Sequence, residues 1–195
     1  LPQKVYYRTP DGGIALNLFT RSDKTFEVNG KTVQIKQETS YPNSGEVKLT
    51  FTCSAPVEFA FQFRTPRWAE SIACAVGNVP CSPEKSPLGY ATVKRVWKSG
   101  DTLAISMPMG WRFVRGRMLQ EGRIALLRGP ILFTFSDTLN ADVLKKCPIP
   151  RDLVLDPASI GDPVLDDRVR PDGQKVVVKA WTSPERKGDQ VDIVL

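Results

Sequence analysis

Alternation of apolar and polar residues with a period of two is the feature that most constrains this chain. In Glu46–Cys53, the side chains of Val47, Leu49, Phe51 and Cys53 point one way and the polar side chains point the other. Successive side chains of a strand lie on opposite faces, so this pattern predicts a strand with one buried side. Strands of this kind are typical of antiparallel sheets that face water on one side.

The same pattern recurs along the chain and is punctuated by turn sequences. Further strands are predicted at Ile14–Phe19, Thr25–Val28, Lys31–Glu38, Val57–Phe63, Ile72–Val76, Tyr90–Val96, Thr102–Met107, Ile124–Leu127, Ile131–Phe135, Val176–Trp181 and Val191–Val194. Asn29-Gly30 separates two of them, which is a strong hairpin signal. No segment of ten or more residues has the apolar period of an amphipathic helix. The sequence therefore predicts an all-β chain, with an antiparallel β-sandwich of jelly-roll type.

The chain is long enough for one domain or two small ones, and we place a boundary near residue 115. Residues 1–115 are predicted to form the sandwich, and residues 116–195 a second, smaller β-rich unit. Predicted strands thin out in this second unit, so we expect it to have a poor independent core. Because the chain stops inside the apolar run Val191–Leu195, we expect the second unit to be truncated, or completed by a segment outside the chain.

The chain contains no histidine, which excludes sites that need an imidazole. Ser–His–Asp triads, Cys–His dyads and zinc sites with histidine ligands are among them. The four cysteines, Cys53, Cys74, Cys81 and Cys147, include no CxxC pair, so no zinc ribbon or thioredoxin motif is indicated. Cys53 and Cys74 lie in apolar, strand-like runs typical of buried thiols, and a disulfide between any two of the four stays open. We expect no metal site and no cofactor.

The net charge of +6 is carried entirely by residues 1–115, which hold 15 basic and 9 acidic side chains. Such a basic part suits nucleic acid, an anionic sugar or an acidic protein surface. Its basic residues are scattered singly along strand-like segments, however, which favours the solvent-facing side of a sheet. No aromatic stacking pattern of the RNA-binding kind accompanies them, so we expect no nucleic-acid partner.

No apolar stretch reaches the roughly 18 residues that a membrane helix needs, so we expect no membrane partner. The sequence begins at Leu1, without an initiator methionine or a secretory signal, as a mature product or an excised fragment does. Its compartment stays open, with a periplasmic or extracellular location slightly favoured over the cytoplasm.

Six short motifs occur in order along the first two thirds of the chain: Gly13–Phe19, Gln37–Pro42, Phe63–Ala69, Arg95–Asp101, Met107–Met109 and Ala125–Leu132. Together they resemble the C-terminal β-sandwich region of glycoside hydrolase family 127, the β-L-arabinofuranosidase-like family. The resemblance covers residues 13–135. It implies that the parent protein is a glycoside hydrolase in which a catalytic (α/α)6 barrel lies N-terminal to this region.

In that family the barrel carries the cysteine nucleophile, the zinc-binding groups and the acid/base glutamate. None of these roles carries over to a cysteine of this chain. The resemblance therefore implies a non-catalytic accessory region whose partner is the barrel. An autonomous carbohydrate-binding module is the alternative.

Trp68 and Arg64, at the end of a predicted strand, are candidates for contact with a sugar or a neighbouring domain. Trp68 offers a flat apolar face to a sugar ring, or else packs as a core aromatic with its indole N–H on a backbone carbonyl. Arg64 suits a carboxylate, and Glu38 and Asp101 are the candidate partners.

Trp111 and Phe113 are candidate interface anchors. They alternate with Arg112 in the boundary segment, a mixture of aromatic and arginine residues typical of interface centres. The alternative is that both rings close the core of the first sandwich.

The acid-rich stretch from Asp156 to Asp167 invites comparison with the paired carboxylates of glycosidases. The prolines within it predict a solvated loop instead, with a calcium site as a weaker alternative. We expect no catalytic residue in this chain.

Overall fold

The computed structural model describes residues 5–168 and 171–195 and is built almost entirely from strands. Its one α-helix over these residues, α1 (Ala141–Lys146), is six residues long. The all-β class predicted from the alternation is confirmed. The backbone divides into two compact units, Leu1–Gly110 and Trp111–Leu195, and each is described by itself.

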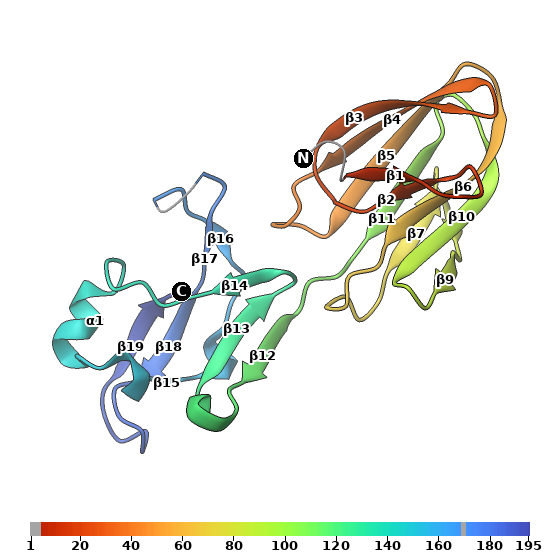
Figure 1. Cartoon of the computed structure of the whole chain (residues 1–195). Coiled ribbons are helices and arrows are strands. Elements are labelled where there is room, and N and C mark those ends of the chain that lie inside the picture. The colour runs from red at the N-terminus through yellow and green to blue at the C-terminus, as the bar shows by residue number, and fades with distance from the viewer. Residues whose placement is uncertain (1–4, 169–170) are drawn as a thin grey trace. The chain divides into compact units, whose positions relative to one another are not determined.

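The first unit is a sandwich of two sheets (Figure 1). The five-stranded sheet has the order β1 (Tyr6–Arg8), β2 (Ile14–Leu16), β6 (Val57–Arg64), β10 (Tyr90–Trp97) and β9 (Glu84–Ser86). The six-stranded sheet has the order β3 (Ser22–Val28), β4 (Lys31–Thr39), β5 (Glu46–Cys53), β11 (Thr102–Ser106), β7 (Ala73–Val76) and β8 (Val79–Cys81).

The core lies between the two sheets and contains the residues that the alternation assigns to one face. Phe51 of β5 packs edge-on against Phe61 of β6, with ring centroids 5.3 Å apart, and stacks on Trp97 of β10 at 4.1 Å. All three side chains are fully buried. The indole N–H of Trp97 donates to the carbonyl of Phe59 at 3.2 Å, which satisfies its only polar group. The predicted sandwich is confirmed by this shared core.

Turn chemistry sets the register of the hairpins. Asn29 and Gly30 both have positive φ and join β3 to β4, with Val28 opposite Lys31, as the Asn-Gly signal predicts. The pairing of β2 with β6 is parallel, unlike every other pairing that the structure describes. Hairpins force antiparallel pairing only on neighbours in sequence, and β2 reaches β6 after the chain has built three strands of the other sheet.

The second unit begins with β12 (Trp111–Arg115), which pairs with β13 (Ile124–Arg128), and β13 pairs with β14 (Ile131–Phe133). Because β12 pairs with β13, the division between the units falls at Gly110, before the boundary near residue 115 expected from sequence. The boundary segment that holds Trp111, Arg112 and Phe113 is therefore a strand of the second unit.

The other strands of this unit are short: β15 (Val154–Leu155), β18 (Val177–Trp181) and β19 (Gln190–Val194) form a second sheet, and β16 (Val164–Leu165) pairs with β17 (Gln174–Lys175). The 3-10 turns η2 (Met118–Gln120), η3 (Pro150–Asp152) and η4 (Pro157–Ser159) lie between them.

The second unit has a core of its own, contrary to the expectation from its sparse strand signals. The core residues are Leu126, Phe133, Val143, Val176, Val178, Ala180, Val191 and Ile193. The buried side chain of Asn140 ties the start of α1 to β19, because its amide donates to the carbonyl of Val194 at 2.8 Å and accepts from the Val194 N–H at 2.7 Å. Side-chain anchoring of this kind, invisible to periodicity, helps to hold a unit with few long strands.

Candidate functional site

A cleft of about 470 Å³ lies at one end of the first sandwich and contains both residues that the sequence singled out there, Trp68 and Arg64. Its walls come from the loops after β2, β4 and β6 and from the loop before β10. Thr65 and Pro66 follow β6, and proline cannot donate to a ladder, so the strand ends and the chain turns. The Thr65 N–H donates to the carbonyl of Gly89 at 2.8 Å, which closes one side of the cleft.

Trp68 is half-buried and belongs to an aromatic wall. Its ring is stacked on Tyr41 with centroids 6.5 Å apart, and Tyr41 in turn lies 5.4 Å from Phe19. Trp68 also packs against the core of the sandwich. Burial raises the pKa of Tyr41, whereas the hydrogen bond that its hydroxyl accepts from Trp68 and the charge of Arg64 act in the opposite direction. Trp68 is therefore partly a core aromatic, whereas its role as a sugar platform stays a prediction.

Arg64 is exposed and points at an amide rather than a carboxylate. Its Nη1 lies 3.3 Å from Asn17 Oδ1, which also accepts from the Tyr90 hydroxyl at 2.9 Å. Glu38 and Asp101, the carboxylates that the sequence offered to Arg64, pair instead with Lys36 at 3.0 Å and Arg95 at 3.4 Å. The expectation of an Arg64–carboxylate bridge is therefore wrong, because Glu38 lies two residues from Lys36 on β4, and Asp101 lies in the turn that follows Arg95 and the end of β10.

The cleft is lined by groups whose chemistry suits ligand binding. An aromatic wall, a guanidinium group and an amide are the groups that hold a hydroxylated or anionic ring. The lining residues are Asn17, Leu18, Phe19, Tyr41, Arg64, Thr65, Pro66, Arg67, Trp68, Leu88 and Gly89. The lining has no acidic side chain, so it offers no carboxylate pair for glycoside hydrolysis. Tyr41 and Asn17 were missed in the sequence because nothing local marks a residue that meets Trp68 or Arg64 only through the fold.

Trp111 and Phe113 both belong to the second unit. The indole N–H of Trp111 donates to the carbonyl of Gly161 at 3.1 Å, and its ring packs edge-on against Phe133 at 4.9 Å. Phe113 is 40% exposed. The alternative that both rings close the core of the first sandwich is wrong, because β12 pairs within the second unit.

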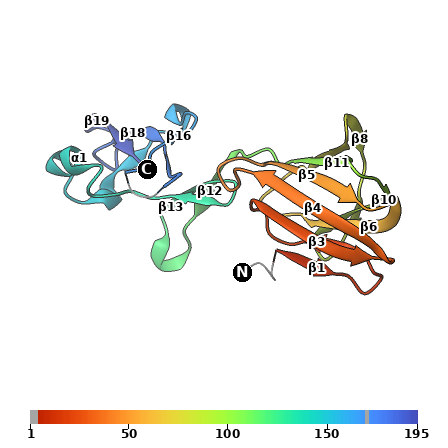
Figure 2. The ribbon, with the colours of Figure 1, turned by 90° about the horizontal axis from the view of Figure 1, so that it is seen from above.

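An apolar tip lies between β12 and β13, where the loop projects from its sheet (Figure 2). Met118 and Leu119 at this tip are 90% and 95% exposed. Gly116 allows the chain to turn tightly, since a Cβ there would come within 1.9 Å of the Gln120 carbonyl. The sequence does not distinguish these two exposed apolar residues from core residues, because burial depends on which other segments pack against them in the fold.

Local hydrogen bonds and ion pairs connect the side chains of the acidic stretch. Asp156 accepts from the Ala158 N–H at 3.1 Å at the start of η4, and Asp167 accepts from the Asp172 N–H at 2.8 Å. Asp166 pairs with Arg168 and Lys175. Within residues 5–168 and 171–195, no group of three or more acidic or cysteine side chains is placed to hold a metal ion. No helix over the same residues has the length and apolar character needed to span a bilayer.

Comparison with known proteins shows which family and which solved structures this chain is similar to. Residues 13–109 match the family model described as the middle domain of β-L-arabinofuranosidases of glycoside hydrolase family 127. No curated protein matches the chain. The matched segment lies within the range of the six motifs and corresponds to the sandwich without the second unit.

Solved structures extend the likeness to both units. A GH127 β-L-arabinofuranosidase from Geobacillus stearothermophilus T6 is 22% identical, with a TM-score of 0.79 over 97% of this chain and 31% of that one. A second GH127 β-arabinofuranosidase is 19% identical, with a TM-score of 0.76 over 98% of this chain and 32% of that one. A glycoside hydrolase that is 24% identical has a TM-score of 0.73 over 97% of this chain and 33% of that one.

The fold is thus that of the β-sandwich portion of glycoside hydrolases, followed by a small β unit. More particularly, residues 13–109 are similar to the middle domain of GH127 enzymes. It spans about a third of the length of the solved structures that it matches.

Proposed function

We propose that this chain is a non-catalytic accessory region of a GH127-type glycoside hydrolase, and that it supports a catalytic (α/α)6 barrel outside the chain. The observation that carries the proposal is the match of residues 13–109 to the GH127 middle domain, together with structural relatives about three times as long. The parent protein is then a β-L-arabinofuranosidase-like enzyme, and the barrel is the partner of this region.

The chemistry of the chain supports an accessory role. Glycoside hydrolysis needs two carboxyl groups on opposite sides of the scissile bond, about 5–9.5 Å apart. The cleft beside Trp68 has no carboxyl group in its lining. We therefore expect the isolated chain to hydrolyse no aryl arabinofuranoside. Turnover that persists through purification and is abolished by Glu38→Gln or Cys53→Ser would contradict the proposal.

The tip of the β12–β13 hairpin is the surface best suited to contact the rest of the parent enzyme. Met118 and Leu119 expose apolar surface, and Arg115, Arg117, Glu121 and Arg123, which are close to them in sequence, are exposed as well. Exposed apolar side chains with polar neighbours are typical of an interface. Contacts between domains of one chain bury about 600–1,500 Å² of surface. The tip of this hairpin would supply part of that buried area.

The test uses the full-length parent enzyme with the paired substitution Met118→Ser and Leu119→Ser. We expect a lower melting temperature of the parent enzyme with an unchanged kcat, because an interface is weakened while the reacting groups stay in place. Leu165→Ser is the matched control, since Leu165 is 68% exposed in the same unit but lies on β16. Deleting the whole region should leave a barrel that is insoluble or less stable. A barrel that folds and works equally well alone would refute the accessory role.

Carbohydrate binding by the isolated chain is the second candidate function, and the cleft beside Trp68 favours it. The aromatic wall of Trp68 and Tyr41 suits the apolar face of a sugar ring, and Arg64 suits its oxygen atoms. An NMR titration with L-arabinofuranose oligosaccharides tests it. Shifts should be confined to the cleft and should be lost in Arg64→Gln, whereas Arg117→Gln, outside the cleft, should bind normally. Absence of shifts at millimolar sugar would exclude this function.

A further inference from the structure

Two cysteines, Cys74 and Cys81, lie directly opposite each other on the paired strands β7 and β8. Gly77 and Asn78 form the turn between these strands, and Val76 lies opposite Val79. Opposed residues of antiparallel strands have Cα atoms about 4.5–5.5 Å apart. Disulfides join cysteines whose Cα atoms are about 4.4–6.8 Å apart, so the backbone already has the spacing that a bond needs.

The two side chains lie on the same face of the hairpin. Cys74 is buried in the core of the sandwich, and Cys81 packs against that core while half-exposed. The thiol of Cys74 donates to the carbonyl oxygen of Cys81 at 3.3 Å. Burial, and then the hydrogen bond and charge of Cys81, raise the pKa of Cys74 to about 12. The Cys74 thiol is therefore in direct contact with the Cys81 residue across the hairpin.

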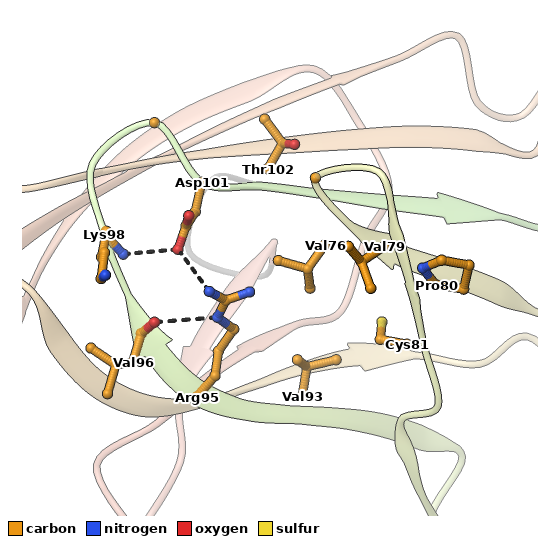
Figure 3. Close-up of a pocket in the computed structure, with 12 residues that line it drawn as sticks. Val76, Val79, Pro80, Cys81, Val93, Arg95, Val96, Lys98, Asp101 and Thr102 are labelled. Carbon is orange, nitrogen blue, oxygen red and sulfur yellow. Dashed lines mark hydrogen bonds and ion pairs between the residues drawn. The ribbon is translucent and has the colours of Figure 1, made fainter.

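Of the two cysteines, Cys81 is the one that solvent reaches. Cys81 lines an open cleft of about 810 Å³, shown in Figure 3, whose other walls are Val93 and Arg95 of β10 and the turn from Lys98 to Asp101. In this cleft Arg95 pairs with Asp101 at 3.4 Å, and the Lys98 N–H donates to Asp101 at 2.9 Å. A small reagent that enters the cleft meets Cys81, whereas Cys74 lies beneath it in the core.

Neither of the other two cysteines, Cys53 and Cys147, lies on β7, on β8 or on a strand that pairs with them. Cys74 lies opposite Ile105, and Ile105 lies opposite Val47 of β5, whereas Cys53 is at the far end of the same strand. Six residues of strand correspond to about 20 Å, far beyond the reach of a disulfide. Cys147 belongs to the second unit, where its thiol donates to the Ile149 carbonyl at 3.4 Å.

We propose that Cys74 and Cys81 form a reversible disulfide site that exchanges with low-molecular-weight disulfides such as oxidised glutathione. The Cys81 thiolate attacks one sulfur of the oxidant, forms a mixed disulfide and releases one thiol. Cys74 then loses its proton and attacks Sγ of Cys81, which forms the Cys74–Cys81 bond and releases the second thiol. Two cysteine thiols are oxidised, one disulfide is reduced, and the protons pass to the released thiolates.

The bond fixes an edge of the six-stranded sheet. β8 is the terminal strand of that sheet, has only three residues and pairs with β7 alone among the described strands. Pro80 within it has no N–H, which suits an edge position. Closing the segment from Cys74 to Cys81 restrains this edge and, with it, the wall of the cleft that Val79 and Pro80 form.

The experiment treats the full chain with oxidised glutathione and counts thiols by alkylation after unfolding and mass spectrometry. The expected result is a fall from the four thiols of the reduced chain to two, with one peptide linking Cys74 to Cys81 and no dimer. Amide hydrogen exchange in β7 and β8 should slow by about tenfold or more, because the bond opposes local opening. Dithiothreitol should reverse both changes.

Single variants separate the site from general oxidation. Cys74→Ser should stop at a mixed disulfide on Cys81, and Cys81→Ser should keep its remaining thiols free. Cys53→Ser and Cys147→Ser are matched controls that should still form the Cys74–Cys81 bond. Four thiols surviving in the treated protein, a bond that includes Cys53 or Cys147, or a bond between two chains would each overturn the proposal.

Discussion

At the scale of single residues, the sandwich depends on aromatic side chains that meet across its two sheets. Phe61 is fully buried, packs edge-on against Phe51 and lies 6.3 Å from the ring of Trp97. Phe61→Ala removes these contacts and leaves a cavity that the surrounding strands cannot fill. We expect the free energy of unfolding of the first unit to fall by about 3–5 kcal/mol. Urea unfolding followed by circular dichroism measures the change.

The control for this substitution is Val96→Ala on the neighbouring strand β10. Val96 is 44% exposed and lies opposite Glu58, so its truncation creates no cavity. Its cost should stay below about 1 kcal/mol. Equal costs for the two variants would show that Phe61 does not belong to the core as the structure has it.

At the scale of elements, a charge cluster holds the short hairpin of β16 and β17. Both oxygens of Asp166 accept from Nε of Arg168 at 2.9 Å, and Lys175 lies 3.0 Å from the same carboxylate. The hydrogen bonds from Arg168, followed by the hydrogen bond from Lys175, hold the pKa of Asp166 well below its usual range. Each strand of this hairpin has only two residues, so these side-chain bonds matter more than in a long ladder.

The pH dependence of this hairpin follows from the sign of that shift. Because the folded pKa lies below the unfolded value of about 3.9, the stabilisation is complete above that pH and is lost as pH falls through the folded pKa. Asp166→Asn should therefore speed amide exchange in β16 and β17 at pH 7, and the difference from the native chain should shrink in strong acid. Asp162→Asn, a nearby exposed acid, is the control. A carboxyl NMR resonance of Asp166 that titrates at or above pH 4 would contradict the prediction.

How much of these elements could be predicted from sequence depends on their length and burial. The twelve strands predicted from the sequence all occur, and the period is clearest in long strands such as β4 and β5, which bury one side. β8 and β16, which have three and two residues, carry no alternation of apolar and polar residues, and their pairing is set by turns and by partners. The parallel pairing of β2 with β6 escaped prediction because no local signal specifies which distant strand will be the neighbour.

The candidate site was partly visible for the same reason. Trp68 and Arg64 stand out in the sequence by residue type and by their place at a strand end. Their contacts with Tyr41 and Asn17 arise only when loops from separate strands meet at one end of the sandwich. Residue type thus predicted two members of the cleft, whereas tertiary structure supplied the others.

At the scale of the whole molecule, the two units have separate cores and share no sheet among the described strands. We therefore expect residues 1–110 and residues 111–195 to fold when expressed separately. The second unit should melt at the lower temperature, since its core is smaller and a domain of this size buries a smaller share of its surface. Each fragment should show a strand-type circular dichroism spectrum and one cooperative thermal transition.

The control is Val178→Ser in the second fragment, which places a hydroxyl at a fully buried position and should abolish that fragment's transition. A second fragment without a cooperative transition, beside a first fragment that folds, would refute the independence of the two units. The core of the second unit would then need a surface from outside these 85 residues, as the sparse strand signals in its sequence suggest.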